Sequence, residues 1–407
     1  RSKMILKHLI VISLFISFSF AQWQQLQKIT SDPRKNAGYF GSSEHSIDAH
    51  NDYLIIGAYN EQSISNINNR TGAAYIYKRD GLSWIFVQRL EDSSLSANDG
   101  FGRSVSIYNS GGIVYAAVSA FHMNSFTGKV FLYKKDANSN SFTLAQKLTA
   151  NDATNYARFG HSVDIGYYEQ NGEGHTEIVI GSPTELHSTQ GGDQEGSVYI
   201  FSNNNPNSSS SGFTQTDKFK ASDRADGDWF GYQVEISSKD IIVGAPYDDV
   251  DGTRDAGSAY IYSVDSNNQW SYQSKLTASD VANENEFGLS VSIHGDYAAI
   301  GAIKVDDNGR SNVGAAYIFK RSGSTWSQQA KIIPSDALSN DFFGIKISIY
   351  NDQVAISNYG HDVANSDAGA VYIYKRNLSD WLPYKKLNQE NPKNDDRLGT
   401  GLSFDGN

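Results

Sequence analysis

Cysteine is absent from the 407 residues, and methionine occurs only twice. Without cysteine the chain cannot form disulfides, use a catalytic thiol or hold zinc through thiolates. After the first 21 residues it also lacks helical periodicity and any apolar run long enough to cross a bilayer. The stability of this chain must therefore come from a core built of many short strands.

Positive charge is in short supply, with 34 Lys and Arg against 45 Asp and Glu and a formal net charge of −11. Removal of Arg1, Lys3 and Lys7 with a leader peptide would take this charge to −14. Nucleic acids and anionic membranes bind basic patches, so the balance argues against both as partners. An acidic surface suits cation binding and plain solubility equally well.

The N-terminus has the pattern of a signal peptide over residues 1–21. A short segment carrying Lys7 precedes the apolar run Leu9–Phe20, and Ser19 and Ala21 are the small residues that signal peptidase requires. We predict cleavage before Gln22 and a secreted, extracellular or cell-surface protein. An uncleaved anchor or a core strand is the alternative interpretation of this segment.

The whole chain is instead rich in Tyr (24), Phe (20) and Gly (36), and these residues recur in a repeat. Four short apolar runs recur in the same order, and such self-similarity is typical of repeat folds. The first begins with an aromatic residue and ends in a basic-apolar-Thr step, the second follows Phe-Gly, the third ends in Gly-Ala, and the fourth is Gly-x-x-Tyr-Ile-Tyr. Examples are Trp270–Thr277, Phe287–Ile293, Ile241–Pro246 and Gly257–Tyr262.

The spacing of the Phe-Gly steps, roughly 55–70 residues, fits four strands a unit and predicts an all-β, seven-bladed β-propeller of four-stranded antiparallel blades. The repeated Phe and Trp are suited to filling space between blades, and the repeated Gly to close approach of backbones. The predicted propeller covers residues 22–407, with blades at about 40–90, 101–148, 159–219, 230–276, 287–332 and 343–387, and a seventh made of 398–407 plus 23–30.

The seventh unit begins at Leu398-Gly399 and lacks its Gly-Ala and Tyr-Ile-Tyr strands before Asn407. We expect the segment 23–30 to supply its fourth strand and close the ring, because closure removes exposed sheet edges. We also expect the sequence to be a fragment that lacks at least two strands. The residues Arg1-Ser-Lys ahead of Met4 favour the same interpretation.

Phe-Gly followed by Gly-Ala-Pro, as in Phe230-Gly231 and Gly244-Ala245-Pro246, resembles the FG-GAP repeats of the integrin α-chain propeller. The short loops are more similar to those of stand-alone extracellular FG-GAP proteins. The resemblance covers about residues 23–405. Two copies depart from the pattern, Val118-Ser-Ala and Ile356-Ser-Asn, which affects local loops and not the fold.

The resemblance implies calcium binding in the loop before a Gly-Ala-Pro strand, and only the third unit has a suitable loop. There Glu169, Asn171, Glu173 and Glu177 have the acid/Asn/acid/Gly/acid spacing that gathers oxygen ligands around a hard cation. We predict Ca²⁺ as a cofactor held by these four residues. The alternative is a polar hairpin whose Asn-Gly step makes the turn.

Other acidic clusters have weaker patterns. The run Asp248–Asp255, its echo Asp306–Gly309 and the group Asp223, Asp226 and Asp228 could hold a cation, but Asp and Gly are also the residues that turns prefer. Three sequons, at Asn69, Asn207 and Asn377, lie in predicted loops and are candidates for glycosylation.

Catalytic motifs are lacking: there is no His-x-His, His-Glu-x-x-His, Gly-x-Ser-x-Gly or phosphate loop. The favoured function is therefore a secreted or cell-surface binding and adhesion module, not an enzyme, which recognises a protein or glycan through its propeller loops with help from calcium. The alternatives are an extracellular propeller hydrolase or lyase, since propellers host both, and a non-catalytic surface scaffold.

Overall fold

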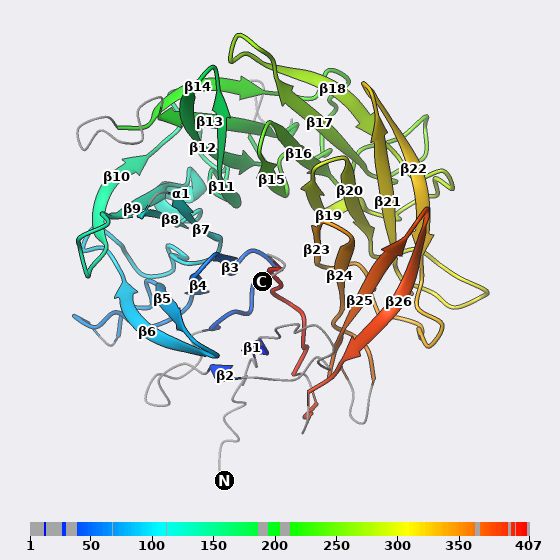
Figure 1. The fold of residues 1–407 in the computed structure, drawn as a ribbon, viewed down its shortest axis with the longest axis horizontal. Helices are drawn as coiled ribbons and strands as arrows, with labels where there is room; N and C mark the ends of the chain where they lie inside the picture. Colours follow the sequence, from blue (N-terminus) through cyan, green and yellow to red (C-terminus); the bar gives the residue numbers. More distant parts are fainter. Residues whose placement is uncertain are drawn as a thin grey trace.

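The computed structural model shows an all-β propeller of four-stranded antiparallel blades (Figure 1). This part of the predicted fold class is confirmed. The structure describes residues 12–13, 27–29, 39–66, 68–110, 112–185, 194–203, 212–362, 367–389, 392–394 and 396–404. No helix in these ranges is long and apolar enough to span a membrane.

Six complete blades follow one another around the axis, coloured from blue to red in Figure 1. Blade 1 contains β3 Ile47–His50, β4 Tyr53–Ala58, β5 Ala73–Asp80 and β6 Ser83–Leu90, and blade 2 contains β7 Val105–Ser110, β8 Ile113–Ser119, β9 Val130–Lys135 and β10 Thr143–Leu148. Blade 3 contains β11 Ser162–Gln170, β12 Glu173–Ser182, β13 Ser197–Asn203 and β14 Thr214–Phe219, and blade 4 contains β15 Val234–Ser237, β16 Asp240–Ala245, β17 Ser258–Val264 and β18 Trp270–Leu276. Blade 5 contains β19 Phe287–His294, β20 Tyr297–Ala302, β21 Ala315–Ser322 and β22 Thr325–Ile332, and blade 6 contains β23 Ile347–Tyr350, β24 Gln353–Asn358, β25 Ala370–Asn377 and β26 Asp380–Leu387.

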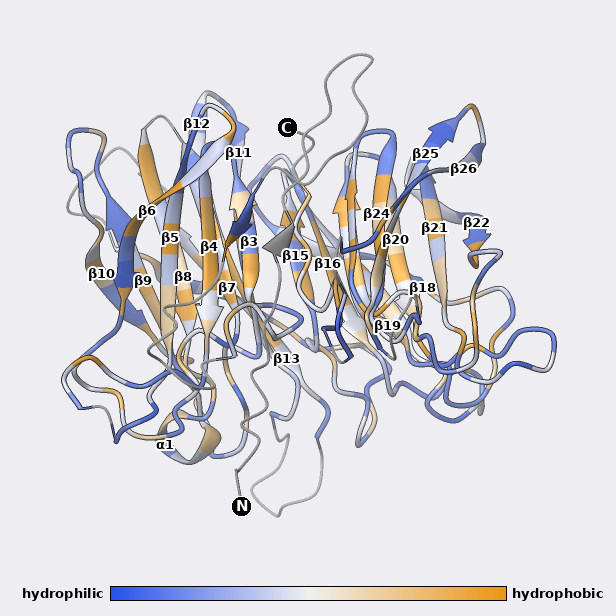
Figure 2. Ribbon diagram, turned by 90° about the horizontal axis from the view of Figure 1, so that it is seen from below, coloured by the Kyte–Doolittle hydropathy of each residue, from blue (hydrophilic) through white to orange (hydrophobic). Residues whose placement is uncertain are grey.

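Burial decreases from the inner strands of a blade to its outer strand. In blade 5 all six residues of β20 are buried, whereas β22 has three exposed, three half-buried and only two buried residues. Figure 2 shows the same gradient, with hydrophobic second and third strands and more hydrophilic outer strands. The hydrophobic core therefore lies between neighbouring blades, where each sheet packs face to face on the next.

The motif residues make the seams between blades. Phe287 has none of its surface exposed and packs edge-on against Tyr317 of its own blade, with ring centroids 5.3 Å apart. Gly288 has a φ of +95°, and a Cβ there would lie 2.1 Å from the carbonyl oxygen of Ser258 in blade 4. A Cβ on Gly244 of the Gly-Ala step would lie 2.0 Å from the carbonyl oxygen of Gly288. The two motif glycines face each other across the seam, which confirms that both allow close backbone approach.

A belt of hydrogen bonds surrounds the axis at the innermost strands. At one position of each repeat a polar side chain binds the backbone of the following repeat, as when Ile107 donates its N–H to Asp48 (2.8 Å) and Ile236 to Asp164 (2.8 Å). Five of these bonds join consecutive blades, and two more run through residues 402–404. The belt residues are Asp48, Ser106, Asp164, Glu235, Ser292, Ser348 and Ser403.

The prediction of seven blades is wrong, because the described residues form six. The seventh position around the axis is held by residues 398–404, which form no strand. Leu398 bridges to Gly369, Ser348 donates to the Phe404 carbonyl (3.3 Å), and Ser403 accepts the Ala49 N–H (3.1 Å). This segment completes the belt but has no described second or third strand to pair with, so a sheet does not form there.

The predicted closing strand at 23–30 is described only at residues 27–29. Within it, β2 Lys28–Ile29 pairs with β1 Ile12–Ser13. Its role as the fourth strand of a seventh blade stays a prediction, because no third strand of that blade is described. The side-chain amide of Gln27 accepts the Trp84 N–H (2.7 Å) and donates to the Trp84 carbonyl (3.2 Å). Gln88 of β6 makes the same pair of hydrogen bonds to the backbone of Phe142. Residues 27–29 therefore lie against blade 1 as the outer strand of a preceding blade would. Of the predicted signal peptide only Ile12 and Ser13 are described.

Candidate functional site

The two ends of the propeller differ in the length of their connections. The hairpins between first and second and between third and fourth strands form one face, which we call the turn face. The longer connections between second and third strands, and between one blade and the next, form the opposite loop face, at the bottom of Figure 2. The single turn α1 Met123–Phe126 also lies there.

The residue before each Phe-Gly step lies on the loop face in an unusual conformation. Trp229 and Phe342 both have a φ of +55°, in the left-handed region that bulky side chains rarely occupy. The same conformation is found at every equivalent position that is not glycine: Tyr39, Arg158, Trp229, Glu286, Phe342 and Arg397. The backbone is held there by bonds to the preceding unit, as when Phe342 donates its N–H to the Asn312 carbonyl (3.1 Å). The surrounding structure must hold a strained conformation of this kind, and here it recurs once in each unit on the loop face.

Aromatic residues that follow the second strands join these positions in stacked groups. Tyr39 stacks on Tyr59 (5.1 Å between centroids), Trp229 packs edge-on against Tyr247 (5.1 Å), and Phe342 stacks on Tyr359 (5.7 Å). We call these six residues the aromatic collar. All six are half-buried, so each has a free surface on the loop face.

Arginines complete the collar. The guanidinium of Arg103 lies 4.9 Å from the Tyr59 centroid, and that of Arg158 lies 5.4 Å from the Trp229 centroid. Such distances allow cation–π attraction. Neither arginine forms a salt bridge with another described residue, so both charges are available to a ligand. Trp, Tyr and Arg are the residues that dominate binding energy in protein interfaces.

The axis beneath the collar is polar. The hydroxyl of Tyr232 donates to Glu44 (3.4 Å), and the backbone carbonyl of Tyr232 lies 2.9 Å from Nδ1 of His161. Burial raises the pKa of Glu44 while Arg103 and Lys346 lower it. Burial lowers the pKa of His161 to about 3, so this ring is neutral at physiological pH.

The predicted calcium residues lie on the β11–β12 hairpin, on the opposite turn face. Asn171 and Gly172 both have positive φ and form its two-residue turn, which is the alternative interpretation of this sequence. Because Glu169 pairs with Gly174 and Glu177 with Gly166, these two carboxylates lie on opposite faces of the hairpin. The exposed Glu169 accepts the Tyr167 hydroxyl (3.1 Å).

Glu177 is buried in blade 3, where Ser202 (2.5 Å) and Tyr168 (3.4 Å) donate hydroxyls to it. Burial raises the pKa of Glu177 to about 7. Glu173 lies on the same face of the hairpin as Glu177, but at the exposed tip. The side-chain amide of Asn171 donates to the Ser266 carbonyl. The structure thus does not gather the four residues, and in the described ranges no three His, Asp or Glu side chains are grouped to hold a metal. Calcium binding here stays a prediction.

The other acidic clusters have structural partners. Asp223 accepts the Tyr260 hydroxyl (2.9 Å) and the Lys275 ammonium (2.6 Å), and Asp248 binds the same ammonium (2.6 Å). Four further carboxylates accept backbone N–H groups: Asp226 from Gln194, Asp228 from Ala225, Asp249 from Asp255 and Asp306 from Asn312.

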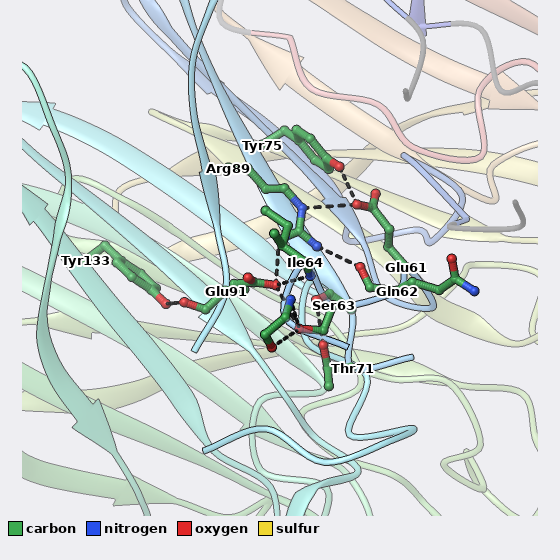
Figure 3. A network of polar contacts seen from close by, with 11 residues as sticks. Glu61, Gln62, Ser63, Ile64, Thr71, Tyr75, Arg89, Glu91 and Tyr133 are labelled. Atoms are coloured by element: carbon green, nitrogen blue, oxygen red, sulfur yellow. Dashed lines mark hydrogen bonds and ion pairs between the residues drawn. The ribbon is translucent and has the colours of Figure 1, made fainter. Parts of the chain in front are cut away.

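This tyrosine–carboxylate–cation contact recurs from blade to blade as a clamp. In blade 5, Asp280 accepts the Tyr317 hydroxyl (2.9 Å) and the Lys331 ammonium (2.6 Å). Figure 3 shows the form in blade 1, where Tyr75 and Arg89 converge on the buried Glu61 at 2.5 and 3.1 Å. The clamp explains the Ser-Asp step of the sequence repeat as a structural feature.

Four stretches of the chain match the model described as FG-GAP repeat, residues 142–201, 213–262, 270–319 and 326–374, which together make about half of the chain. The protein belongs to the FG-GAP repeat family. Each of these FG-GAP units begins with the fourth strand of one blade and ends in the third strand of the next. A repeat that spans two blades ties each sheet covalently into its neighbour.

Human integrin alpha-E is 29% identical to this FG-GAP chain over 136 residues, which are 32% of the chain and 11% of the integrin. The chain therefore matches only about a tenth of that relative's length. Among solved structures, the periplasmic gluconolactonase PpgL of Pseudomonas aeruginosa superposes with a TM-score of 0.54, covering 94% of this chain and 93% of that one at 9% identity. At this identity the superposition shows a shared fold alone.

Sequence reasoning singled out Phe-Gly and missed the residue before it. A signal was present, because an aromatic residue precedes Phe-Gly or follows the Gly-Ala region in several units, as at Tyr39, Tyr59 and Trp229. That these side chains gather on one face could not be seen without the fold.

Proposed function

We propose that this FG-GAP protein is an extracellular or cell-surface binding and adhesion module that recognises a protein partner through the aromatic collar of its loop face. The observation that supports it is the set of half-buried aromatic rings that contact one another in pairs on the loop face, with two arginines that form no salt bridge with another described residue. The resemblance to an integrin α chain favours an extracellular location and a protein as the partner.

The collar has the energetic character of a binding hot spot. Its rings are rigid and held in place by stacking, so little entropy is lost when a partner covers them. Truncation of a hot-spot Trp or Tyr costs 2 kcal/mol or more, and each 1.4 kcal/mol is a tenfold change in affinity. Removal of Trp229 should therefore weaken binding by more than about tenfold.

Site-specific photocrosslinking tests the proposal. A benzophenone amino acid replaces Trp229 in one preparation and Tyr272 in another, and each is applied to live cells of the source organism. Tyr272 is a matched control because it is 49% exposed on the outer strand of the same blade. We expect a discrete cell-surface protein to be crosslinked from position 229 alone. The same products from both positions, or none from 229, would overturn the proposal.

Affinity measurements on the partner so identified then separate binding from folding. The double variant Trp229→Ala/Tyr247→Ala should lose binding, whereas Tyr272→Ala/Tyr384→Ala should retain it, since Tyr384 is also an exposed outer-strand residue. The enzyme alternative requires turnover of a substrate, and the scaffold alternative requires self-assembly of the purified chain. Turnover by the folded variant Trp229→Ala/Tyr247→Ala would favour the enzyme, and self-assembly of this variant would favour the scaffold.

The predicted glycans fit an extracellular location but stay predictions. Asn377 is exposed at the turn between β25 and β26, and Asn69 is half-buried in a loop of blade 1. Asn207 lies outside the described residues.

A further inference from the structure

A cavity of about 390 Å³ opens around the axis at the turn face, on the end of the propeller opposite the collar. The innermost strands of all six blades and residues 402–404 line it. Its volume falls in the range of small-molecule sites, about 300–1,000 Å³. Its wall has three levels: a floor near Lys346, the belt, and a rim of aromatic rings.

The floor holds an unpaired cation. Lys346 is only 8% exposed, yet its ammonium has no hydrogen bond or salt bridge to any described residue. The carboxylates that act on it electrostatically, all from more than ion-pair distance, are Glu235, Glu44, Asp164 and Asp48. A buried ammonium without a partner is costly, and it must be satisfied by water or by a ligand.

An unpaired acceptor lies on the same wall. Oε1 of Glu235 accepts both the Ser292 hydroxyl (2.9 Å) and the Ile293 N–H (3.0 Å), which leaves Oε2 without a described donor. Burial raises the pKa of Glu235 to about 7 and also raises the pKa of Asp164. Burial lowers the pKa of Lys346, against the pull of these carboxylates. The cavity thus offers a free donor and a free acceptor that do not reach each other.

Aromatic rings form the rim. His50 stacks on Tyr108 (4.1 Å between centroids), and Tyr108 stacks on Tyr167 (6.3 Å). On another side of the mouth His294 lies against Tyr350 (4.4 Å). Rings of this kind present an apolar face together with a polar edge, so they suit a ligand that is partly apolar and partly hydrated.

We propose that this cavity binds a neutral sugar, with its hydroxyl groups between Lys346 and Glu235 and its ring against the aromatic rim. A hydroxyl group is both donor and acceptor, so one hydroxyl can accept from the ammonium while it or its neighbour donates to the carboxylate. Because an ammonium and carboxyl groups line the same cavity, neither a cation nor an anion meets a lining of opposite charge alone, whereas a neutral polar ligand can bond to both kinds of group. The site is independent of the collar and of any protein partner there.

Saturation-transfer NMR on the full chain tests this with defined probes: a panel of neutral monosaccharides, choline as an organic cation and acetate as an anion. We expect saturation of at least one monosaccharide and of neither charged probe. Lys346→Met and Glu235→Gln should each weaken that signal by at least tenfold. Lys320→Met, at an exposed lysine on β21, is the matched control and should leave it unchanged.

Three results would overturn the proposal. These are preferential binding of choline or acetate, sugar binding that both cavity variants retain, and no binding by the wild-type chain beyond that of an unrelated protein. Melting temperatures of the variants must stay within a few degrees of wild type, and if Lys346→Met misfolds, Glu235→Gln alone decides. A glycan array then tells whether the cavity binds a free sugar or the end of a glycan chain. If it binds glycan ends, binding on the array should depend on the terminal residue of the glycan.

This outcome is distinguishable from that of the collar experiment. The double variant Trp229→Ala/Tyr247→Ala should bind the monosaccharide as wild type does, because the two sites lie on opposite faces.

Discussion

Single glycines decide whether the blades can pack. Gly288 and Gly227 have nearly the same φ, +95° and +92°, but only Gly288 faces a neighbouring blade. A Cβ at Gly288 would lie 2.1 Å from the Ser258 carbonyl oxygen, whereas a Cβ at Gly227 would meet nothing within 4 Å.

We therefore expect Gly288→Ala to lower the free energy of unfolding by more than about 3 kcal/mol and Gly227→Ala by only about 1–2 kcal/mol, the cost of a left-handed alanine. Denaturant titration of both variants measures the difference. Equal losses would show that the backbone conformation and not the seam requires glycine.

Buried carboxyl groups give the stability of the protein an unusual dependence on pH. The pKa of Glu177 is raised by burial from its ordinary 4.5 to about 7. A raised folded-state pKa contributes stability that is complete below pH 4.5 and is lost as pH rises through about 7. Asp228, whose pKa burial also raises to about 7, acts in the same direction.

The melting temperature should consequently fall between pH 5 and pH 8, and Glu177→Gln should reduce this fall. We expect the variant to resemble wild type at pH 5 and to be more stable at pH 8 by on the order of 2 kcal/mol. Glu169→Gln, at an exposed residue of the same hairpin, serves as control. If both variants keep the wild-type pH profile, burial of Glu177 is not the cause.

At the scale of the element, the β11–β12 hairpin shows how far a ligand pattern can be followed from sequence. The spacing of Glu169, Asn171, Glu173 and Glu177 is that of a calcium loop, but spacing does not state whether the backbone forms a loop or an extended ladder. In a ladder, residues an odd number of positions apart on one strand point to opposite faces. With Gln170 paired to Glu173, Glu169 lies opposite Gly174, which is three positions from Glu177 on the same strand. The side chains of Glu169 and Glu177 therefore point to opposite faces of the hairpin.

Thermal melting with millimolar calcium and with chelator decides between the two arrangements. If the predicted calcium site forms, calcium should raise the melting temperature, because a ligand that binds only the native state stabilises it. If the hairpin keeps the four residues apart, the melting temperature should be the same in both conditions. A calcium-dependent rise that Glu173→Ala abolishes would instead show that the hairpin opens into the predicted cage.

Strand order was predictable because the same four apolar runs recur with turn residues between them. The Phe-Gly and Gly-Ala steps indicated close approach of backbones, and the structure gives each step its contact. The clamp of Asp280, Tyr317 and Lys331 was not predictable, since it joins residues from two units whose distance depends on the twist of the blade. The collar and the cavity likewise depend on which residues the ring brings to one end of the axis.

At the scale of the whole molecule, the number of belt positions differs from the number of blades. The belt has seven positions, whereas the described residues form six four-stranded sheets. Sequence reasoning located the seventh repeat at Leu398 but could not show whether a sheet would form there. Residues 398–404 have no described ladder partner, so the belt, one bridge to Gly369 and the packing of their apolar side chains on blade 6 hold them. Their stability should therefore depend on the belt more than that of any strand in a blade.

Asp48 is the belt residue on which this dependence can be tested. It accepts the Ser403 hydroxyl (3.1 Å) on one side and the Ile107 N–H (2.8 Å) on the other. In Asp48→Ala we expect amide hydrogen exchange in residues 398–404 to accelerate by at least tenfold, while amides of β20 keep their protection, because local opening is cheaper than global unfolding. Ser292→Ala removes a belt link between blades 5 and 6 and should leave 398–404 unchanged. Equal acceleration in both variants would mean that the ring opens as one unit, and the seventh position would then be held by the rigidity of the whole propeller.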